Sequence, residues 1–235
     1  MKILLSGLSV TFLFCNLAIA GTIVAENGPH AAFNAIPFGS ASGPGAGEYQ
    51  EIYSASLFGG PVDLTSFAFS PDTTGLYSAN VVLRLTTTSV SVGSLSNNLN
   101  SNFATPLTTV FSNAAFSESV TGGSETFSLV FDLTTPFLYN PASGNLLLDV
   151  LISGQTYSGF GFSRSDAGPI ISRAYNVAIG NNADSVGLRT TIGFTSVPEP
   201  GTMFLTLVGL ATALVVVSGK SPSRNPCVSK RPLSS

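Results

Sequence analysis

Hydrophobic residues recur at every second position in several stretches of this chain, and this period limits the fold more than any other feature. In one such stretch, Val81, Leu83 and Leu85 alternate with residues of mixed polarity. Successive side chains of a β-strand point to opposite faces, so a period of two predicts strands that bury one face. Between residues 21 and 196 no stretch keeps the 3.6-residue period of an amphipathic helix. The sequence therefore predicts an all-β fold for this part of the chain.

The stretches with strand character are separated by segments rich in Gly, Pro, Asn and Ser. The predicted strands are residues 22–25, 49–58, 64–70, 81–86 with an extension to 92, 110–116, 127–132, 146–152, 175–179 and 188–195. The predicted loops are residues 27–47, 95–109 and 153–168, with a turn at Gly180-Asn181-Asn182. Short strands at this spacing predict two antiparallel sheets packed face to face. A jelly-roll-like sandwich is the preferred form, and an immunoglobulin-like sandwich is the alternative.

The same alternation predicts which side chains fill the space between the sheets. We expect these to be Val81, Leu83, Leu85, Phe127, Leu129, Phe131, Leu146, Leu148, Val150, Ile192 and Phe194. Residues 146–152 are apolar at nearly every position, so their register is open. Either Leu146 and Leu148 face inward, or Leu147 and Leu151 do.

The charge of residues 21–196 excludes some classes of partner. This part carries eleven acidic residues against four arginines, a formal charge of −7, and no lysine lies between Lys2 and Lys220. Such a surface argues against nucleic acid and anionic lipid as partners. The two cysteines, Cys15 and Cys227, lie outside this part, which must therefore fold without disulfides or thiolate metal sites.

The first 20 residues have the pattern of a secretory signal peptide. Lys2 supplies the positive start, and residues 3–14 are mostly apolar. Ala18-Ile19-Ala20 is a small-x-small cleavage site. Signal peptidase is therefore expected to recognise Ala18 and Ala20 and to leave Gly21 as the first residue of an exported domain, residues 21–196.

A long apolar run near the C-terminus predicts a membrane span. Residues 201–219 contain no charge and are apolar on every face. As a helix with a rise of about 1.5 Å per residue, the run would span roughly 28 Å, close to the hydrocarbon core of a bilayer. Basic residues without any acid follow in the tail, residues 220–235: Lys220, Arg224, Lys230 and Arg231. The positive-inside rule places this tail in the cytoplasm and the domain outside.

The run is preceded by Val197, Pro198, Glu199 and Pro200, and the whole of residues 197–235 resembles the PEP-CTERM sorting signal of exported bacterial proteins. The resemblance implies a substrate of an exosortase, located in the inner membrane or, after sorting, at the cell surface. It also implies an association with exopolysaccharide and biofilm matrix. A plain membrane anchor without processing is the alternative.

The middle of the chain is similar to extracellular domains of the choice-of-anchor type that PEP-CTERM proteins carry. The residues concerned are 49–53 with Phe58, 64–69 and 136–150. The similarity implies a β-sandwich and assigns it no chemistry.

Enzyme chemistry finds little support in the residues. His30 is the only histidine, and no nucleophile-elbow motif accompanies it, so a Ser-His-Asp triad is not predicted. One histidine also excludes a histidine-based zinc site. Glu48 and Glu51 are close in sequence, but a strand would place them on opposite faces. We predict no enzyme, and a hydrolase that uses two acids brought together by folding is the least favoured alternative.

Two kinds of ligand are considered. The oxygens of Asp166, Asn181, Asn182 and Asp184 are hard donors that suit a structural calcium ion, although Asn and Asp also favour turns by themselves. Sugar rings stack on exposed aromatic side chains, and without Trp the candidates are Tyr49, Tyr53, Tyr77, Tyr139, Tyr157 and Tyr175. The sequence thus predicts an exported, non-enzymatic surface protein with a structural role, and a carbohydrate-binding surface module is the alternative.

Overall fold

The computed structural model describes residues 19–39, 47–159, 161–178 and 180–197, and the predicted all-β class is confirmed there. The strands are β1 (Ala20–Ala25), β2 (Ala32–Asn34), β3 (Gly47–Tyr53), β4 (Val62–Phe69), β5 (Gly75–Thr88), β6 (Thr108–Val120), β7 (Leu129–Tyr139), β8 (Asn145–Tyr157), β9 (Phe162–Ser165), β10 (Ile171–Val177), β11 (Gly180–Asp184), β12 (Gly187–Leu188) and β13 (Thr190–Ser196). Short 3-10 turns are η2 (Ala55–Leu57), η3 (Leu99–Ser101) and η4 (Pro141–Ser143).

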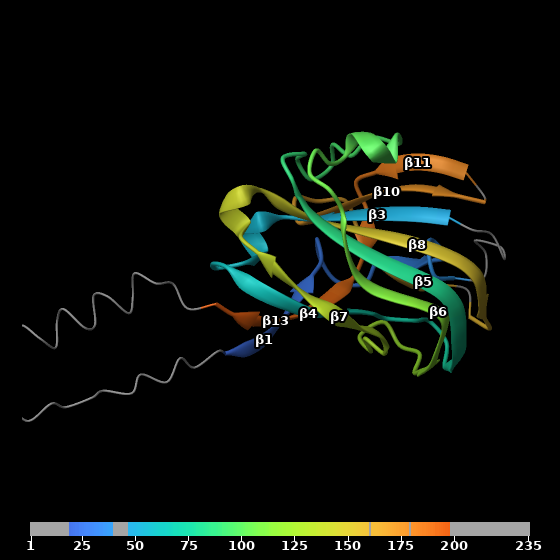
Figure 1. Ribbon diagram of the computed structural model, residues 1–235. Coiled ribbons are helices and arrows are strands. Elements are labelled where there is room, and N and C mark those ends of the chain that lie inside the picture. The colour runs from blue at the N-terminus through green and yellow to red at the C-terminus, as the bar shows by residue number, and fades with distance from the viewer. Residues whose placement is uncertain (1–18, 40–46, 160, 179, 198–235) are drawn as a thin grey trace, which may run out of the picture. The chain divides into compact units, whose positions relative to one another are not determined.

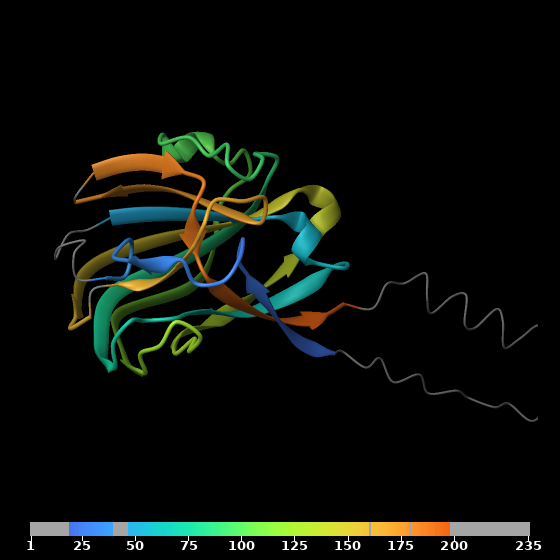
Figure 2. The same cartoon turned by 180° about the vertical axis from the view of Figure 1, so that it is seen from behind.

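The strands form three antiparallel sheets (Figure 1). A four-stranded sheet has the order β1-β13-β4-β7, and a six-stranded sheet has the order β11-β10-β3-β8-β5-β6. These two sheets pack together, as a β-sandwich requires, and one hydrophobic core contains residues from both. A small third sheet has the order β12-β9-β2, and its strands β2 and β9 lie side by side on the face seen in Figure 2.

Aromatic rings occupy the centre of the core. Phe38 is fully buried, and its ring centroid lies 4.8 Å from that of Phe69, 5.5 Å from that of Phe162 and 5.6 Å from that of Phe131. These rings come from the four-stranded sheet, from β9 and from the segment after β2. Aromatic burial therefore joins the small sheet to the main core.

Most of the predicted core residues are buried as expected, with two exceptions. Phe127 lies before β7 and is only half-buried, because its ring lies 5.7 Å from the Arg189 guanidinium instead of between the sheets. Phe194 is half-buried on β13 and packs against the core. Its cross-strand partner on β1 is Gly21, and the Phe194 ring occupies the space that a side chain at residue 21 would need.

The central strand β8 is buried on both faces. Leu146 and Leu148 face the main core, and Leu147 belongs to a second, smaller cluster on the opposite side of the sheet. This cluster is formed with residues 89–107, which we call the cover loop. Both faces of β8 are therefore apolar, which explains why its register was ambiguous in the sequence.

Three short strands, β2, β9 and β11, were not predicted, and the predicted strand 188–195 is divided into β12 and β13. Two of them, β2 and β9, lie in segments expected to be loops, residues 27–47 and 153–168. The predicted turn at Gly180-Asn181-Asn182 is wrong, because these residues form β11 and pair with β10. The pairing of β10 with β11 includes Val177 opposite Gly180.

The first and last strands lie next to each other. Ala20 pairs with Thr195, and the Ser196 amide donates a 2.9 Å hydrogen bond to the Ile19 carbonyl. Most of the predicted signal peptide, residues 198–200 of the sorting motif, the predicted span 201–219 and the tail 220–235 lie outside the described residues. In the ranges that the structure describes, no helix is long and apolar enough to cross a membrane.

Candidate functional site

A polar cleft lies on the outer face of the six-stranded sheet. Three cross-strand neighbours form one side: Glu48 on β3 pairs with Asn176 on β10, which pairs with Asn181 on β11. The cover loop forms the other side. The cleft has a volume of about 310 Å³ and is lined by Glu48, Asn97, Asn98, Leu99, Asn100, Asn176 and Asn181.

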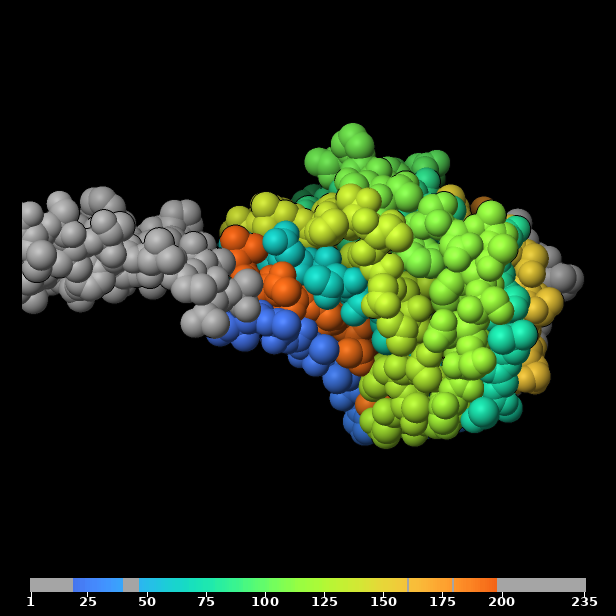
Figure 3. All heavy atoms as spheres, turned by 60° about the horizontal axis from the view of Figure 1, so that its bottom comes forward, coloured from blue at the N-terminus to red at the C-terminus, as the bar shows by residue number. Residues whose placement is uncertain are grey.

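The cover loop is fixed to the sheet by a buried asparagine. The Asn102 side chain donates to the Gln50 side-chain oxygen at 2.8 Å and to the Ser96 carbonyl at 2.9 Å, and it accepts from the Ser96 amide at 2.7 Å. Gly93 adds a 2.7 Å hydrogen bond from its amide to the Ser172 hydroxyl. The loop stands out from the domain (green atoms at the top of Figure 3) and is nevertheless held in place.

One arginine joins Glu48, which lines the cleft, to a second acid. Arg84 on β5 donates to the Glu48 carboxylate at 2.9 Å and to the Asp149 carboxylate at 2.6 Å. The other Asp149 oxygen accepts from the Gln50 amide at 2.9 Å. Burial and the neighbouring Asp149 raise the pKa of Glu48 to about 7. Near neutral pH, Glu48 can therefore act as a hydrogen-bond donor or acceptor.

The pair of Glu48 and Asp149 does not form a hydrolytic site. Glycosidases need two carboxyl groups that both reach the substrate. Here Asp149 is fully buried, each of its oxygens already accepts a hydrogen bond, and it does not line the cleft. The geometry suits binding better than acid–base catalysis.

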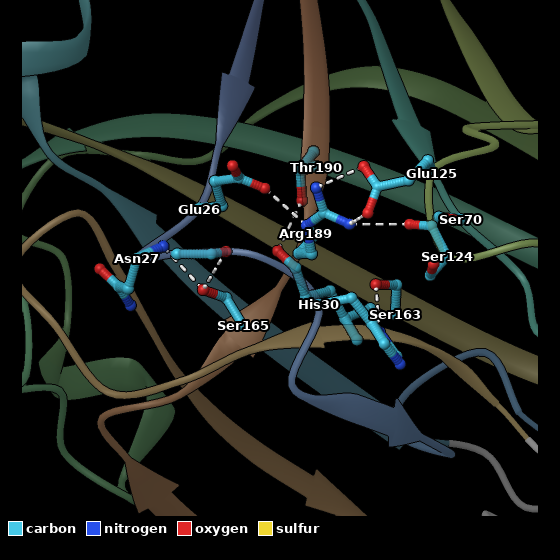
Figure 4. A network of polar contacts seen from close by, with 12 residues as sticks. Glu26, Asn27, His30, Ser70, Ser124, Glu125, Ser163, Ser165, Arg189 and Thr190 are labelled. Carbon is cyan, nitrogen blue, oxygen red and sulfur yellow. Dashed lines mark hydrogen bonds and ion pairs between the residues drawn. The ribbon is translucent and has the colours of Figure 1, made fainter.

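His30 lies apart from this cleft. Its Nδ1 is 2.8 Å from the Ser163 hydroxyl, and its ring centroid is 4.5 Å from that of Phe33 (Figure 4). Ser163 is fully buried, so no substrate reaches its hydroxyl. Its backbone also pairs with Ser70. The contact between His30 and Ser163 is therefore part of the packing of β9.

Arg189 forms the second charged network (Figure 4). Its guanidinium donates to Glu26 at 2.5 Å, to the Ser124 carbonyl at 2.8 Å and to both oxygens of Glu125 at 2.6 and 2.8 Å. Arg189 is 4% exposed. These hydrogen bonds lower the pKa of Glu125. The network ties the start of β13 to the end of β1 and to the loop between β6 and β7.

Glu51 lies inside the core, on the opposite face of β3 from Glu48, as the alternation predicts. Its Oε2 accepts hydrogen bonds from the Tyr49 hydroxyl and the Leu188 amide, whereas Oε1 has no partner. Burial raises the pKa of Glu51 to about 8, although Tyr49, Leu188 and Arg173 act in the opposite direction. A buried acid at this position was not predicted from the sequence.

The calcium donors considered from the sequence are dispersed. Both Asp184 oxygens accept from the Arg173 guanidinium, at 2.9 and 3.0 Å, and Asp166 lies 3.9 Å from Arg164. Asn181 lines the cleft, and Asn182 lies on the other face of β11. Among the described residues, no three His, Cys, Asp or Glu side chains cluster as metal ligands.

The tyrosines do not form a stacking surface. Five of the six are buried, and Tyr175 packs against the main core, so none of them lines the cleft. The cleft itself was missed because its asparagines come from three separate predicted segments: a loop, a strand and a turn. Of the predicted processing residues, Ala20, Gly21 and Val197 are described, and the others lie outside the described ranges.

Comparisons with protein-family models, curated proteins and solved structures found no match for this chain.

Proposed function

We propose that this chain is an exported, non-enzymatic bacterial surface protein with a structural role in an exopolysaccharide or biofilm matrix. In this proposal, residues 1–20 are a signal peptide and residues 197–235 anchor the protein in the inner membrane or direct its sorting by an exosortase. The ectodomain, residues 21–196, is a jelly-roll-like β-sandwich.

The position of the folded unit supports this proposal. The first described strand begins at Ala20 and the last ends at Ser196, so the described strands begin and end within one residue of the predicted processing points. Cleavage after Ala20 would remove one residue of β1 and keep Gly21 opposite Phe194. All strands of such an ectodomain would lie between the signal peptide and the tail. These two segments would be attached to β1 and β13, which are neighbours in the sheet.

The non-enzymatic assignment is supported by the acids and by His30. Asp149 and Glu51 are fully buried, and His30 contacts a buried serine. All four arginines of the domain are in ion pairs, so a surface of net negative charge has no free arginine among the described residues to attract nucleic acid.

The sorting hypothesis is tested with Glu199→Ala in a host that contains an exosortase. We expect this variant to insert normally but to escape processing, because Glu199 lies outside the apolar run and only the enzyme would read it. The measurement is membrane fractionation together with the mass of the mature protein. Equal mass and location for wild type and Glu199→Ala would mean that the tail is a plain anchor.

Membrane anchoring is checked in the same experiment with charged residues in the run. One charge at the centre of a span costs about 2.5–3.5 kcal/mol on insertion scales, so Leu210→Arg should weaken anchoring without abolishing it. The double variant Leu207→Arg/Leu214→Arg should release the protein. Retention of the double variant in the membrane would contradict an anchor at residues 201–219.

A further inference from the structure

The cleft on the six-stranded sheet gathers amide side chains that the fold does not use. Asn97, Asn98, Asn100, Asn176 and Asn181 are exposed, and their side chains make no hydrogen bond within the described part of the chain. Asn102, two residues after Asn100 in the same loop, is 1% exposed and makes three side-chain hydrogen bonds. The asparagines of one loop therefore divide into one that holds the loop and others that face the cleft.

The two sides of the cleft are held in fixed positions. Glu48, Asn176 and Asn181 lie in register on three hydrogen-bonded strands. The opposite side is attached through Asn102 and through Leu99, which packs into the second hydrophobic cluster. A ligand would therefore meet amide groups whose backbone is already ordered, which lowers the entropic cost of binding.

The chemistry of the lining selects the class of ligand. Each asparagine side chain offers an acceptor oxygen and two N–H donors, and each hydroxyl of a sugar both donates and accepts. Amides carry no net charge, so they suit a neutral ligand. An anionic ligand would lie against the Glu48 carboxyl group, and a cation would compete with the Arg84 guanidinium, 2.9 Å from that group.

We propose that this cleft binds a neutral, polyhydroxylated ligand, namely one or two rings of an uncharged polysaccharide chain. Its volume of about 310 Å³ lies at the lower end of the range for small-molecule sites. Recognition uses hydrogen bonds rather than ring stacking, because Leu99 is the only apolar residue in the lining. The inference rests on the proposed matrix role only for the source of the ligand. The cleft geometry is independent of how the tail is processed.

The test is calorimetric titration of the full chain, purified in a detergent without a sugar head group. The probes are neutral disaccharides of glucose, galactose, mannose and N-acetylglucosamine, an anionic uronic acid disaccharide, and calcium chloride. We expect at least one neutral disaccharide to bind. The double variant Asn176→Ala/Asn181→Ala should bind it at least about tenfold more weakly, because each lost hydrogen bond weakens binding about three- to tenfold.

Asn182→Ala is the matched control. Asn182 is also an exposed asparagine on β11, but it faces away from the cleft, so its replacement should leave affinity unchanged. Equal melting temperatures for wild type and all variants exclude a folding defect. The inference is overturned if no neutral disaccharide binds, if only calcium or the anionic sugar binds, or if Asn182→Ala weakens binding as much as the double variant. Normal sorting without sugar binding would reject only the proposed sugar site. Sugar binding without sorting would reject only the sorting hypothesis.

Discussion

At the residue scale, Glu51 is an acidic side chain that lies inside the hydrophobic core. It is fully buried, and its pKa is raised to about 8. In the unfolded chain its pKa is near the ordinary value of about 4.3. Between these two pH values the folded state keeps a proton that the unfolded state loses, so the free energy of unfolding falls as pH rises. Above about pH 8 the full loss is present.

We therefore predict that Glu51→Gln flattens this dependence. Glutamine keeps an oxygen that accepts from Tyr49 and Leu188, but it cannot ionise. Glu51 contributes a slope of up to about 1.4 kcal/mol per pH unit, which the variant should lose. The measurement is denaturant unfolding from pH 5 to pH 9. Glu48, whose pKa is also raised, contributes to both proteins, so the difference between them isolates Glu51.

Asp132→Asn is the control for this experiment, since Asp132 is an exposed acid on β7. It should keep the slope of the wild type. A parallel pH dependence for wild type and Glu51→Gln would show that Glu51 is already ionised in the core at neutral pH.

The sequence could predict the face of a residue but not what covers that face. Alternation correctly separated Glu48 from Glu51 and placed Val81, Leu83 and Leu85 in the core. It could not show that the face of β3 with Glu51 is sealed by Leu188, which is 137 positions away. The exposure of a side chain depends on such contacts with distant parts of the sequence. The sequence alone therefore could not show that five of the six tyrosines are buried and cannot stack on a sugar.

At the scale of elements, Arg189 joins three segments through one guanidinium. We predict that Arg189→Met destabilises the domain by roughly 1–3 kcal/mol, because hydrogen bonds to charged groups are lost and Glu26 is left without its partner. The stability of Arg189→Lys should lie between that of the wild type and that of Arg189→Met, since an ammonium cannot reproduce the bidentate geometry toward Glu125. Thermal and denaturant unfolding measure the change.

The comparison for Arg189 is Arg164→Met. Arg164 has one long ion pair, 3.9 Å, with an exposed acid, and such pairs contribute about 0–1 kcal/mol. An equal effect of the two substitutions would mean that the Arg189 network does not hold the strands together.

Long strands were predictable and short ones were not. Strands β4, β5 and β8 have enough alternating apolar residues to be identified from sequence. By contrast, β11 reads Gly-Asn-Asn-Ala-Asp and is defined by its hydrogen bonds to β10. A short edge strand of polar residues has the composition of a turn, and only tertiary pairing distinguishes them. The asparagine cleft depends on this strand, so it could not be found from the sequence.

At the scale of the whole molecule, the fold is closed by its last strand. β13 lies inside the four-stranded sheet, where it pairs with β1 on one side and β4 on the other. Ile23 on β1 pairs with Ile192 on β13, which lies 169 positions later in the chain. Contacts of such long range form late, because the closure entropy of the intervening chain must be overcome first. If the chain is exported as proposed, the domain would complete its fold only after residue 196 had crossed the membrane.

We therefore predict that a chain ending at Leu188 does not fold, whereas a chain ending at Val197 does. Removing β13 takes the buried Ile192 out of the core, leaves β1 without a partner and exposes one edge of β4. The shorter chain should lose the cooperative thermal transition and be cut rapidly by protease, and the longer chain should resist. If the chain ending at Leu188 kept a cooperative transition and the same protection, β13 would be an addition to a domain that is already stable, and folding would not depend on release of its C-terminal end.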